Sequence, residues 1–161
     1  MKIKRIIEME VERQDLMVGD KIQIADSLWK VLDIQDDKAL IWKCTNITDH
    51  VFNKNGSNKY EGSDIQRYLQ VDFPETMTVE ILEDVTKEGF FLLTEEQIRK
   101  YMPQELDRIA TDEDGCTTWY WTASPNVGSG YYVRYVGTGG GIYSGTANYS
   151  YGVAPACWIH L

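Results

Sequence analysis

The sequence predicts one α+β domain dominated by antiparallel β-structure. Its 161 residues are 43% hydrophobic and 25% charged, which is ordinary for a single globular domain with its own core. Short segments that alternate polar and apolar residues are separated by turns rich in Gly, Asn, Asp and Ser, as in antiparallel strands. Two capping sequences between these segments indicate short helices packed against a sheet.

Three strands are expected near the N-terminus. Asp20–Ala25 alternates polar and apolar residues, Ser27–Ile34 and Ala39–Asn46 follow, and the polar turn Gln35–Lys38 joins the last two. Together they predict a β-meander. Residues 1–17 are expected to form an extension or a further strand, so the core of a single domain over residues 1–161 is expected at about residues 18–161.

Short helices are expected in the middle of the chain. The sequences SDIQ at Ser63 and TEEQ at Thr94 have the pattern of a capping box, in which side chains bind free backbone N–H groups. A third short helix is expected within Phe73–Leu82, because Pro74 is well placed in a first helical turn.

The remaining elements are expected to be strands and loops. Phe90–Leu93 is expected to be a short buried strand, and Leu106–Gly115 an acidic loop. Further strands are expected at Thr117–Ala123, Tyr131–Val136, Gly141–Ser144 and Tyr151–Leu161. In the first of these, Trp119 and Trp121 are two residues apart and should lie on one side of the sheet.

The composition changes sharply near Pro125. Residues 1–125 carry all 25 acidic side chains and 15 of the 16 Lys and Arg, a net charge of −10, whereas residues 126–161 carry only Arg134. The tail is too short for a core of its own and ends in the apolar run VAPACWIHL. It is therefore expected to complete the sheet of the preceding part.

Several protein classes are disfavoured. The net charge of −9 argues against nucleic-acid binding, which needs a basic surface. No apolar run approaches the roughly 18 residues that span a bilayer, and residues 1–16 lack the apolar block of a signal peptide. We therefore expect a cytoplasmic protein or one carried on a phage or cell-surface assembly. Cys44, Cys116 and Cys157 form no C-x-x-C motif, so reduced, mostly buried thiols are expected, with a Cys116–Cys157 bridge as the alternative.

No motif indicates catalysis. Gly137–Gly141 follows a strand, but no helix follows it to complete a phosphate site. Asp112–Gly115 lacks the alternating oxygen ligands of a calcium loop. His50 and His160 are isolated, and no Ser or Cys lies in a recognisable nucleophile motif. We expect neither an enzyme nor a bound metal or cofactor.

The most specific signal is Gly128–Gly152, which holds six Tyr, many Gly, Ser and Asn, one Arg and no acid. Tyr offers a large amphipathic contact area with few torsions to fix, and Ser, Gly and Asn offer adaptable hydrogen bonds, as in antibody contact loops. Aromatic rings also pack on the C–H faces of sugars. This composition predicts a contact surface. The alternative is an ordinary sheet with Tyr on its solvent face and Gly and Asn in its turns.

Several segments in a fixed order resemble one family. Trp119–Pro125 (WYWTASP), the YYV segment at Tyr131 and the ending Tyr151–Leu161 are similar to bacterial domains of unknown function common in gut Firmicutes, which end in W-W-L-R-S-P … A-Y-V … G-V-R-P-A-L-W-I-N-L. Upstream of these segments, the strand Trp29–Asp33 and a capped helix occur in the same order as in those domains. The resemblance covers about Val18–Leu161.

The ending also resembles C-type-lectin-fold proteins, including the formylglycine-generating-enzyme-like group and the variable proteins of diversity-generating retroelements. This resemblance implies a C-type-lectin-like domain with an invariant frame and a variable binding face. The frame would be Trp119, Trp121, Ser124, Pro125, Gly152, Pro155 and Trp158. Together with the composition, it indicates as ligand-binding residues Tyr131, Tyr132, Arg134, Tyr135, Ile142, Tyr143, Ser144, Asn148 and Tyr149.

The chain departs from the resembled patterns at several positions. Ala123 and Ala154 stand where arginines are usual, so this chain must hold its sheet by other means. No E-P-N, Q-P-D or W-N-D motif occurs, and Cys116 and Cys157 do not match the copper-binding pair of the formylglycine enzyme. Calcium-dependent sugar binding and that catalysis are therefore not implied.

We expect a non-catalytic domain that presents the tyrosine-rich surface to a protein or a cell-surface glycan, as a retroelement-diversified variable protein does. One alternative is a structural or assembly module of a phage or cell-surface complex. The other is an enzyme with a site near His160, Cys157 or Asp112–Asp114. The sequence leaves the ligand and the oligomeric state open.

Overall fold

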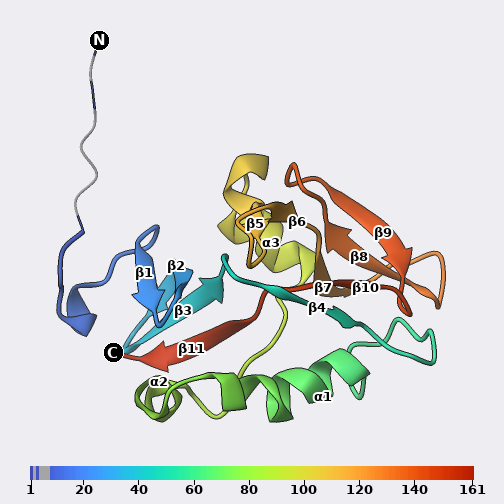
Figure 1. Cartoon of the computed structure of the whole chain (residues 1–161), viewed down its shortest axis with the longest axis horizontal. Coiled ribbons are helices and arrows are strands. Elements are labelled where there is room, and N and C mark those ends of the chain that lie inside the picture. The colour runs from blue at the N-terminus through green and yellow to red at the C-terminus, as the bar shows by residue number, and fades with distance from the viewer. Residues whose placement is uncertain (2, 4–7) are drawn as a thin grey trace.

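Two β-sheets form the body of the protein in the computed structural model, which describes residues 1, 3 and 8–161 (Figure 1). The first sheet has the strand order β1–β2–β3–β11, and the second has the order β4–β10–β7–β8–β9. Neighbouring strands are antiparallel except β10 and β7, which pair in parallel through Gly152 and Tyr120. The predicted α+β class, rich in antiparallel strands, is confirmed.

The first sheet is the predicted N-terminal meander joined by the last strand of the chain. Its strands are β1 (Lys21–Ile24), β2 (Ser27–Gln35), β3 (Lys38–Lys43) and β11 (Ala156–His160). Because β11 pairs with β3 along its whole length, the tail completes the sheet of the preceding part, as expected. Before β1, Arg13–Asp15 form a 3-10 helix, η1, while residues 2 and 4–7 of the predicted extension lie outside the described residues.

The second sheet is built mainly from the C-terminal part of the chain. Its strands are β4 (Thr48–Val51), β7 (Tyr120–Pro125), β8 (Tyr132–Val136), β9 (Ile142–Thr146) and β10 (Ser150–Val153). The expectation of one strand over Tyr151–Leu161 is wrong, because Ala154 and Pro155 separate β10 from β11. Proline has no N–H to donate to a ladder. The chain crosses from the second sheet to the first at this point.

The segment expected to be an acidic loop, Leu106–Gly115, is more structured than predicted. It contains most of η3 (Glu105–Arg108) and β5 (Ala110–Thr111), which pairs with β6 (Thr117–Thr118). Phe90–Leu93 is buried as expected except at Phe91, but it forms a single bridge to β11 rather than a strand.

The helices are α1 (Asp64–Val71), η2 (Phe73–Thr76), α2 (Val79–Asp84) and α3 (Glu95–Tyr101). The capping box at Thr94 is complete. At Ser63 it is half formed, because the Gln66 side chain accepts from the N–H of Gly62. In Figure 1, α1 and α2 run along the lower side of the molecule, and α3 lies on the other side of β10 and β4, near β5 and β6. No helix in the described part of the chain is long and apolar enough to cross a membrane.

Two apolar clusters form the core. One includes Trp29, Phe52 and Trp121 and packs against α1; the other includes Trp42 and Tyr120 and packs against α3. Trp121 is fully buried, as expected for a frame residue.

Trp158, another expected frame residue, is only partly buried, with the Lys38 ammonium 4.8 Å from its ring centroid. All three cysteines are free: Cys44 and Cys157 are buried and Cys116 is exposed, so the alternative bridge is not formed.

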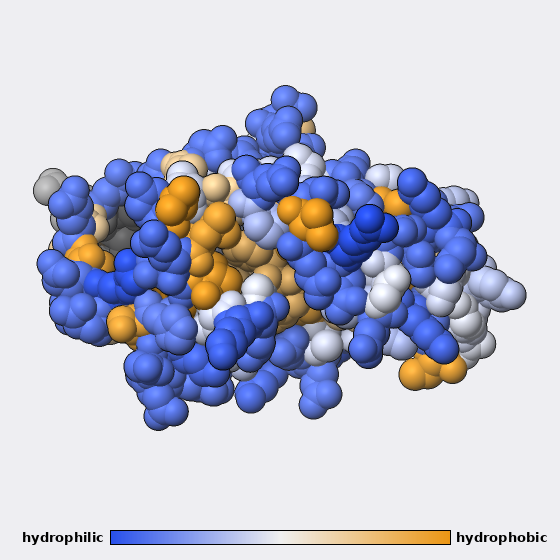
Figure 2. All heavy atoms as spheres, turned by 90° about the horizontal axis from the view of Figure 1, so that it is seen from below, coloured by the Kyte–Doolittle hydropathy of each residue, from blue (hydrophilic) through white to orange (hydrophobic). Residues whose placement is uncertain are grey.

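The lower side of the molecule exposes apolar residues within a polar surround. Figure 2 shows this face, on the side where α1 and α2 lie. In these two helices, Val71 of α1 and Val79 of α2 are exposed, whereas Ile81 and Leu82 of α2 pack partly buried against the core.

Candidate ligand-binding surface

The two faces of the second sheet divide the nine predicted binding residues. Alternate residues of a strand point to opposite faces, and residues paired across strands share a face. Tyr135 pairs with Tyr143, so both lie on one face. Arg134 pairs with Ser144 on the other face, where Ile142 also lies. The structure therefore does not bring the nine residues together.

A continuous group of aromatic rings lies on the first of these faces. Trp119, Tyr135, Tyr143, Tyr149 and Tyr151 are here called the aromatic face. The Tyr135 ring centroid lies 4.7 Å from that of Tyr151, 5.8 Å from Trp119 and 5.9 Å from Tyr143, and Tyr149 lies 6.4 Å from Tyr151. Trp119, Tyr143 and Tyr149 are 43%, 56% and 58% exposed. The group therefore offers several uncovered rings side by side.

The inner edge of the aromatic face is anchored in the core. Tyr151 packs on buried Trp121 at a centroid distance of 4.6 Å, and the Trp121 indole donates to the carbonyl of His50 at 3.0 Å. Burial raises the pKa of Tyr151, and the neighbouring Tyr135 and Tyr149 raise it further. Such aromatic pairs contribute about 0.5–1.5 kcal/mol each beyond the area they bury. Tyr135 and Tyr151 are thus held in place, while the outer rings remain exposed.

Glycines in β9 and the preceding turn make room for these rings. A Cβ at Gly145 would lie 2.8 Å from Tyr151 Cε2 and 3.2 Å from Tyr135 Cε1. A Cβ at Gly141 would lie 2.6 Å from the Tyr143 hydroxyl oxygen. The tyrosines therefore lie directly on glycine backbone. Besides allowing turns and loop freedom, these glycines are therefore required for steric reasons.

Two members of the aromatic face, Trp119 and Tyr151, are not among the nine predicted binding residues. Trp119 was assigned to the frame, and Tyr151 was placed in the closing strand. The signal was present in the sequence, because Trp119 lies two residues before Trp121 and must share its face. A strand face is exposed wherever no helix packs on it. Only the structure shows that no helix among the described residues covers the strand face beside Trp119.

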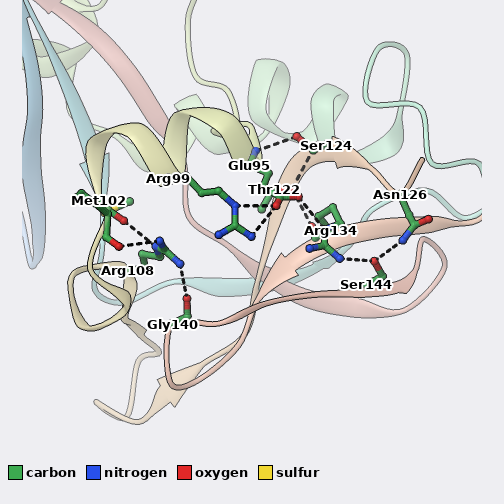
Figure 3. Close-up of polar contacts among 11 residues, drawn as sticks. Glu95, Arg99, Met102, Arg108, Thr122, Ser124, Asn126, Arg134, Gly140 and Ser144 are labelled. Carbon is green, nitrogen blue, oxygen red and sulfur yellow. Dashed lines mark hydrogen bonds and ion pairs between the residues drawn. The ribbon is translucent and has the colours of Figure 1, made fainter. Parts of the chain in front are cut away.

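The opposite face of the sheet carries a polar network with α3 (Figure 3). Arg134 donates through Nε to Glu95 Oε1 at 2.8 Å and through NH1 to the Ser144 hydroxyl at 3.0 Å. Asn126 donates to the same hydroxyl at 2.8 Å, and Arg99 also pairs with Glu95. The hydrogen bond from Arg134 lowers the pKa of Glu95, and Arg99 lowers it further. Arg134 and Ser144 are thus engaged within the protein.

A second arginine holds the turn between β8 and β9. Arg108 is buried, and its guanidinium donates to the carbonyls of Met102 at 2.7 Å, Pro103 at 3.1 Å and Gly140 at 3.2 Å (Figure 3). It thereby ties the end of α3 to the glycine-rich turn. In this chain, which has alanine at positions 123 and 154, Arg108 and Arg134 hold the second sheet against α3.

The remaining predicted residues lie at the other end of the β8–β9 hairpin. A shallow hollow of about 320 Å³ is lined by Gly56, Tyr131, Tyr132, Thr146, Ala147 and Asn148. Tyr131 and Tyr132 are exposed there, apart from the rings of the aromatic face. The predicted surface is therefore three separate places: the aromatic face, the α3 network and this hollow.

The residues considered for a hidden enzyme site do not converge. Cys157 is buried in the core, where burial raises the pKa of its thiol, and His160 is exposed at the end of β11. The Asp112 carboxylate accepts the N–H groups of Asp114 and Cys116 within its own turn. In residues 1, 3 and 8–161, no group of three or more His, Cys, Asp or Glu is placed to hold a metal ion.

Comparison with known proteins gives a match to a family model. Residues 82–161 match the model of a family described as a domain of unknown function (DUF6273). No curated protein and no solved structure matches the chain. The matched segment runs from α2 to the C-terminus and contains the whole aromatic face. The C-terminal part of the chain is thus similar to a domain of unknown function, as the sequence resemblance suggested.

Proposed function

We propose that this protein is a non-catalytic ligand-binding domain of C-type-lectin-like architecture, and that the aromatic face is its contact surface. The observation that carries the proposal is the unbroken group of five rings, anchored on one side by Trp121 and exposed at Trp119, Tyr143 and Tyr149. The pairing of the last strand with the N-terminal meander supports the architecture.

The aromatic face has the properties of a recognition surface. Tyr and Trp are enriched among the residues that contribute most to binding. Because Tyr135 and Tyr151 are already packed, these two side chains have little entropy left to lose when a partner docks. Gly128–Gly152 holds no acid. Asp49 of β4 pairs with Gly152, which alternates with Tyr151 along β10, so the Asp49 side chain lies on the opposite face of the sheet. Docking therefore buries no carboxylate from these strands. A protein surface or a glycan fits this chemistry.

The same geometry argues for a fixed rather than a diversified surface. A retroelement-diversified protein must tolerate substitution at each variable position. Arg134 and Ser144, two of the positions that the resemblance implies, are bound to Glu95 and Asn126. We therefore limit the proposal to recognition through the aromatic face.

The proposal is tested by selecting binders and asking where they bind. The full chain is screened against a glycan microarray and a random peptide display library, and each binder is retested on Trp119→Ala/Tyr143→Ala. Tyr132→Ala is the matched control, because Tyr132 is exposed outside the aromatic face. We expect binding to fall at least about tenfold in the double variant, the loss expected from hot-spot residues, and to persist in the control.

Three results would contradict the proposal. The double variant retains the binders, the control loses them equally, or neither library yields a binder. The alternative is an assembly module whose aromatic face is buried in a fixed oligomer. Sedimentation of the same variants tests it, because such an oligomer should dissociate in Trp119→Ala/Tyr143→Ala.

A further inference from the structure

A second candidate site lies on the first sheet and is independent of the aromatic face. A cavity of about 530 Å³ opens between the β1–β2 hairpin, the end of α3 and η3. Its volume falls within the range of roughly 300–1,000 Å³ that is usual for small-molecule sites. Its walls combine the charged residues Lys21, Lys30 and Asp107 with apolar side chains, principally Leu32, Met102 and Ile109.

The two lysines are an unusual pair. Lys21 and Lys30 are directly opposite each other in the register of β1 and β2, so both side chains leave the same face of the sheet. Like charges in this position destabilise a sheet. Throughout the described residues, no carboxylate lies within ion-pair distance of either ammonium. Asp107, which also lines the cavity, partly balances the two positive charges from outside ion-pair distance.

Lys30 is also held in a costly position. It is half-buried, and its ammonium lies 5.8 Å from the ring centroid of Trp42. Burial lowers the pKa of Lys30, Cys44 and Asp107 act in the opposite direction, and the charge of Lys21 lowers it by a smaller amount. The Lys30 ammonium donates to the Asp107 carbonyl at 2.7 Å. An ammonium has three N–H donors, so two remain for a ligand.

We propose that this cavity binds a small amphipathic carboxylate, with its charged group between Lys21 and Lys30 and its apolar body against Leu32, Met102 and Ile109. A bound anion would relieve the repulsion between the two ammonium groups and would form charge-assisted hydrogen bonds with them. The apolar wall selects against inorganic anions, which gain nothing from it. This inference goes beyond the proposed function, because the site shares no residue with the aromatic face.

Octanoate is a suitable probe for the proposal. Binding is measured by calorimetry on the full chain, and the affected amide signals are mapped by NMR. We expect saturable binding with shifts at Lys21, Lys30 and Ile109. Octanamide, which has the same tail but no charge, should bind at least about tenfold more weakly, since hydrogen bonds to charged groups are the stronger ones.

Lysine variants test whether octanoate binds in this cavity. Lys21→Met/Lys30→Met should weaken octanoate binding at least about tenfold, because both charged partners are lost. The matched control is Lys54→Met/Lys59→Met, which removes two exposed lysines outside the cavity and should leave the affinity unchanged. Lys21→Met alone, at an exposed position, keeps the test valid if the double variant unfolds.

Any of four outcomes would overturn the proposal. Octanoate fails to bind, octanamide binds as tightly, the Lys21 and Lys30 variants keep full affinity, or the shifts map to the aromatic face. None of these outcomes bears on the glycan and peptide screens, so the two proposals fail separately.

Discussion

The two faces of the β8–β9 hairpin come from the same tyrosine- and glycine-rich sequence, yet they differ in how their side chains are used. On the side of α3, Arg134 and Ser144 are bound to partners within the protein. On the other side, Tyr143 is exposed and rests on glycine backbone. Local composition marks the hairpin as unusual. The register of the strands decides which residues are left to meet a ligand.

The sharpest test of this comparison uses two tryptophans of the same face. Trp121→Ala should lower the free energy of unfolding by about 3–5 kcal/mol, because it leaves a cavity in the core. Trp119→Ala should cost about 1 kcal/mol, because its ring is exposed and loses only contacts with other rings. Urea denaturation measures both values. Equal losses would show that Trp119 is a core residue and not part of a contact surface.

The steric role of glycine predicts the next largest effect. Gly145→Ala should destabilise the protein by about 1–3 kcal/mol, because the new methyl group collides with Tyr151 and Tyr135. Gly139→Ala is the control, since a Cβ there meets nothing within 4 Å. Thermal denaturation of both variants distinguishes them. A neutral Gly145→Ala would mean that the rings do not lie on β9 as described.

A smaller effect is expected on the side of α3. The Glu95 pKa is lower in the folded protein than in the unfolded chain, mainly because of Arg134. The stabilisation by Glu95 is therefore present above its unfolded pKa of about 4.3 and is lost as the pH falls through the lower, folded value.

Arg134→Met should lower stability at pH 7 by about 1 kcal/mol, since the pair is partly exposed. It should also lessen the loss of stability on acidification below the unfolded pKa of Glu95. Denaturation across this pH range checks both effects. If stability falls with pH equally in both proteins, Arg134 does not stabilise the ionised form of Glu95.

Much of the fold is predictable from local patterns. The period-two alternation of Asp20–Ala25 and Ser27–Ile34 corresponds to β1 and β2, and Thr94 begins α3 with a complete capping box. The split of Tyr151–Leu161 was missed, because one continuous apolar run serves two sheets. The pairing of β5 with β6 was missed, because strands of two residues carry no periodicity.

The candidate site was predictable in composition and not in arrangement. Because Arg134 and Tyr135 are consecutive residues, as are Tyr143 and Ser144, the sequence predicts that the two members of each pair lie on opposite faces of the sheet. Which face a helix covers depends on tertiary packing, and so does the cavity between β1, β2 and η3. Lys21 and Lys30 are nine residues apart, and only the strand register brings them opposite each other.

Tyrosine nitration with a selected binder tests the central claim most directly. Tetranitromethane should modify the exposed Tyr131, Tyr132, Tyr143 and Tyr149 in the free protein, as read by mass spectrometry of the peptides. With the binder bound, the account predicts protection of Tyr143 and Tyr149 while Tyr132 remains reactive. Protection of Tyr132 with Tyr143 still fully reactive would contradict the assignment of the aromatic face as the contact surface.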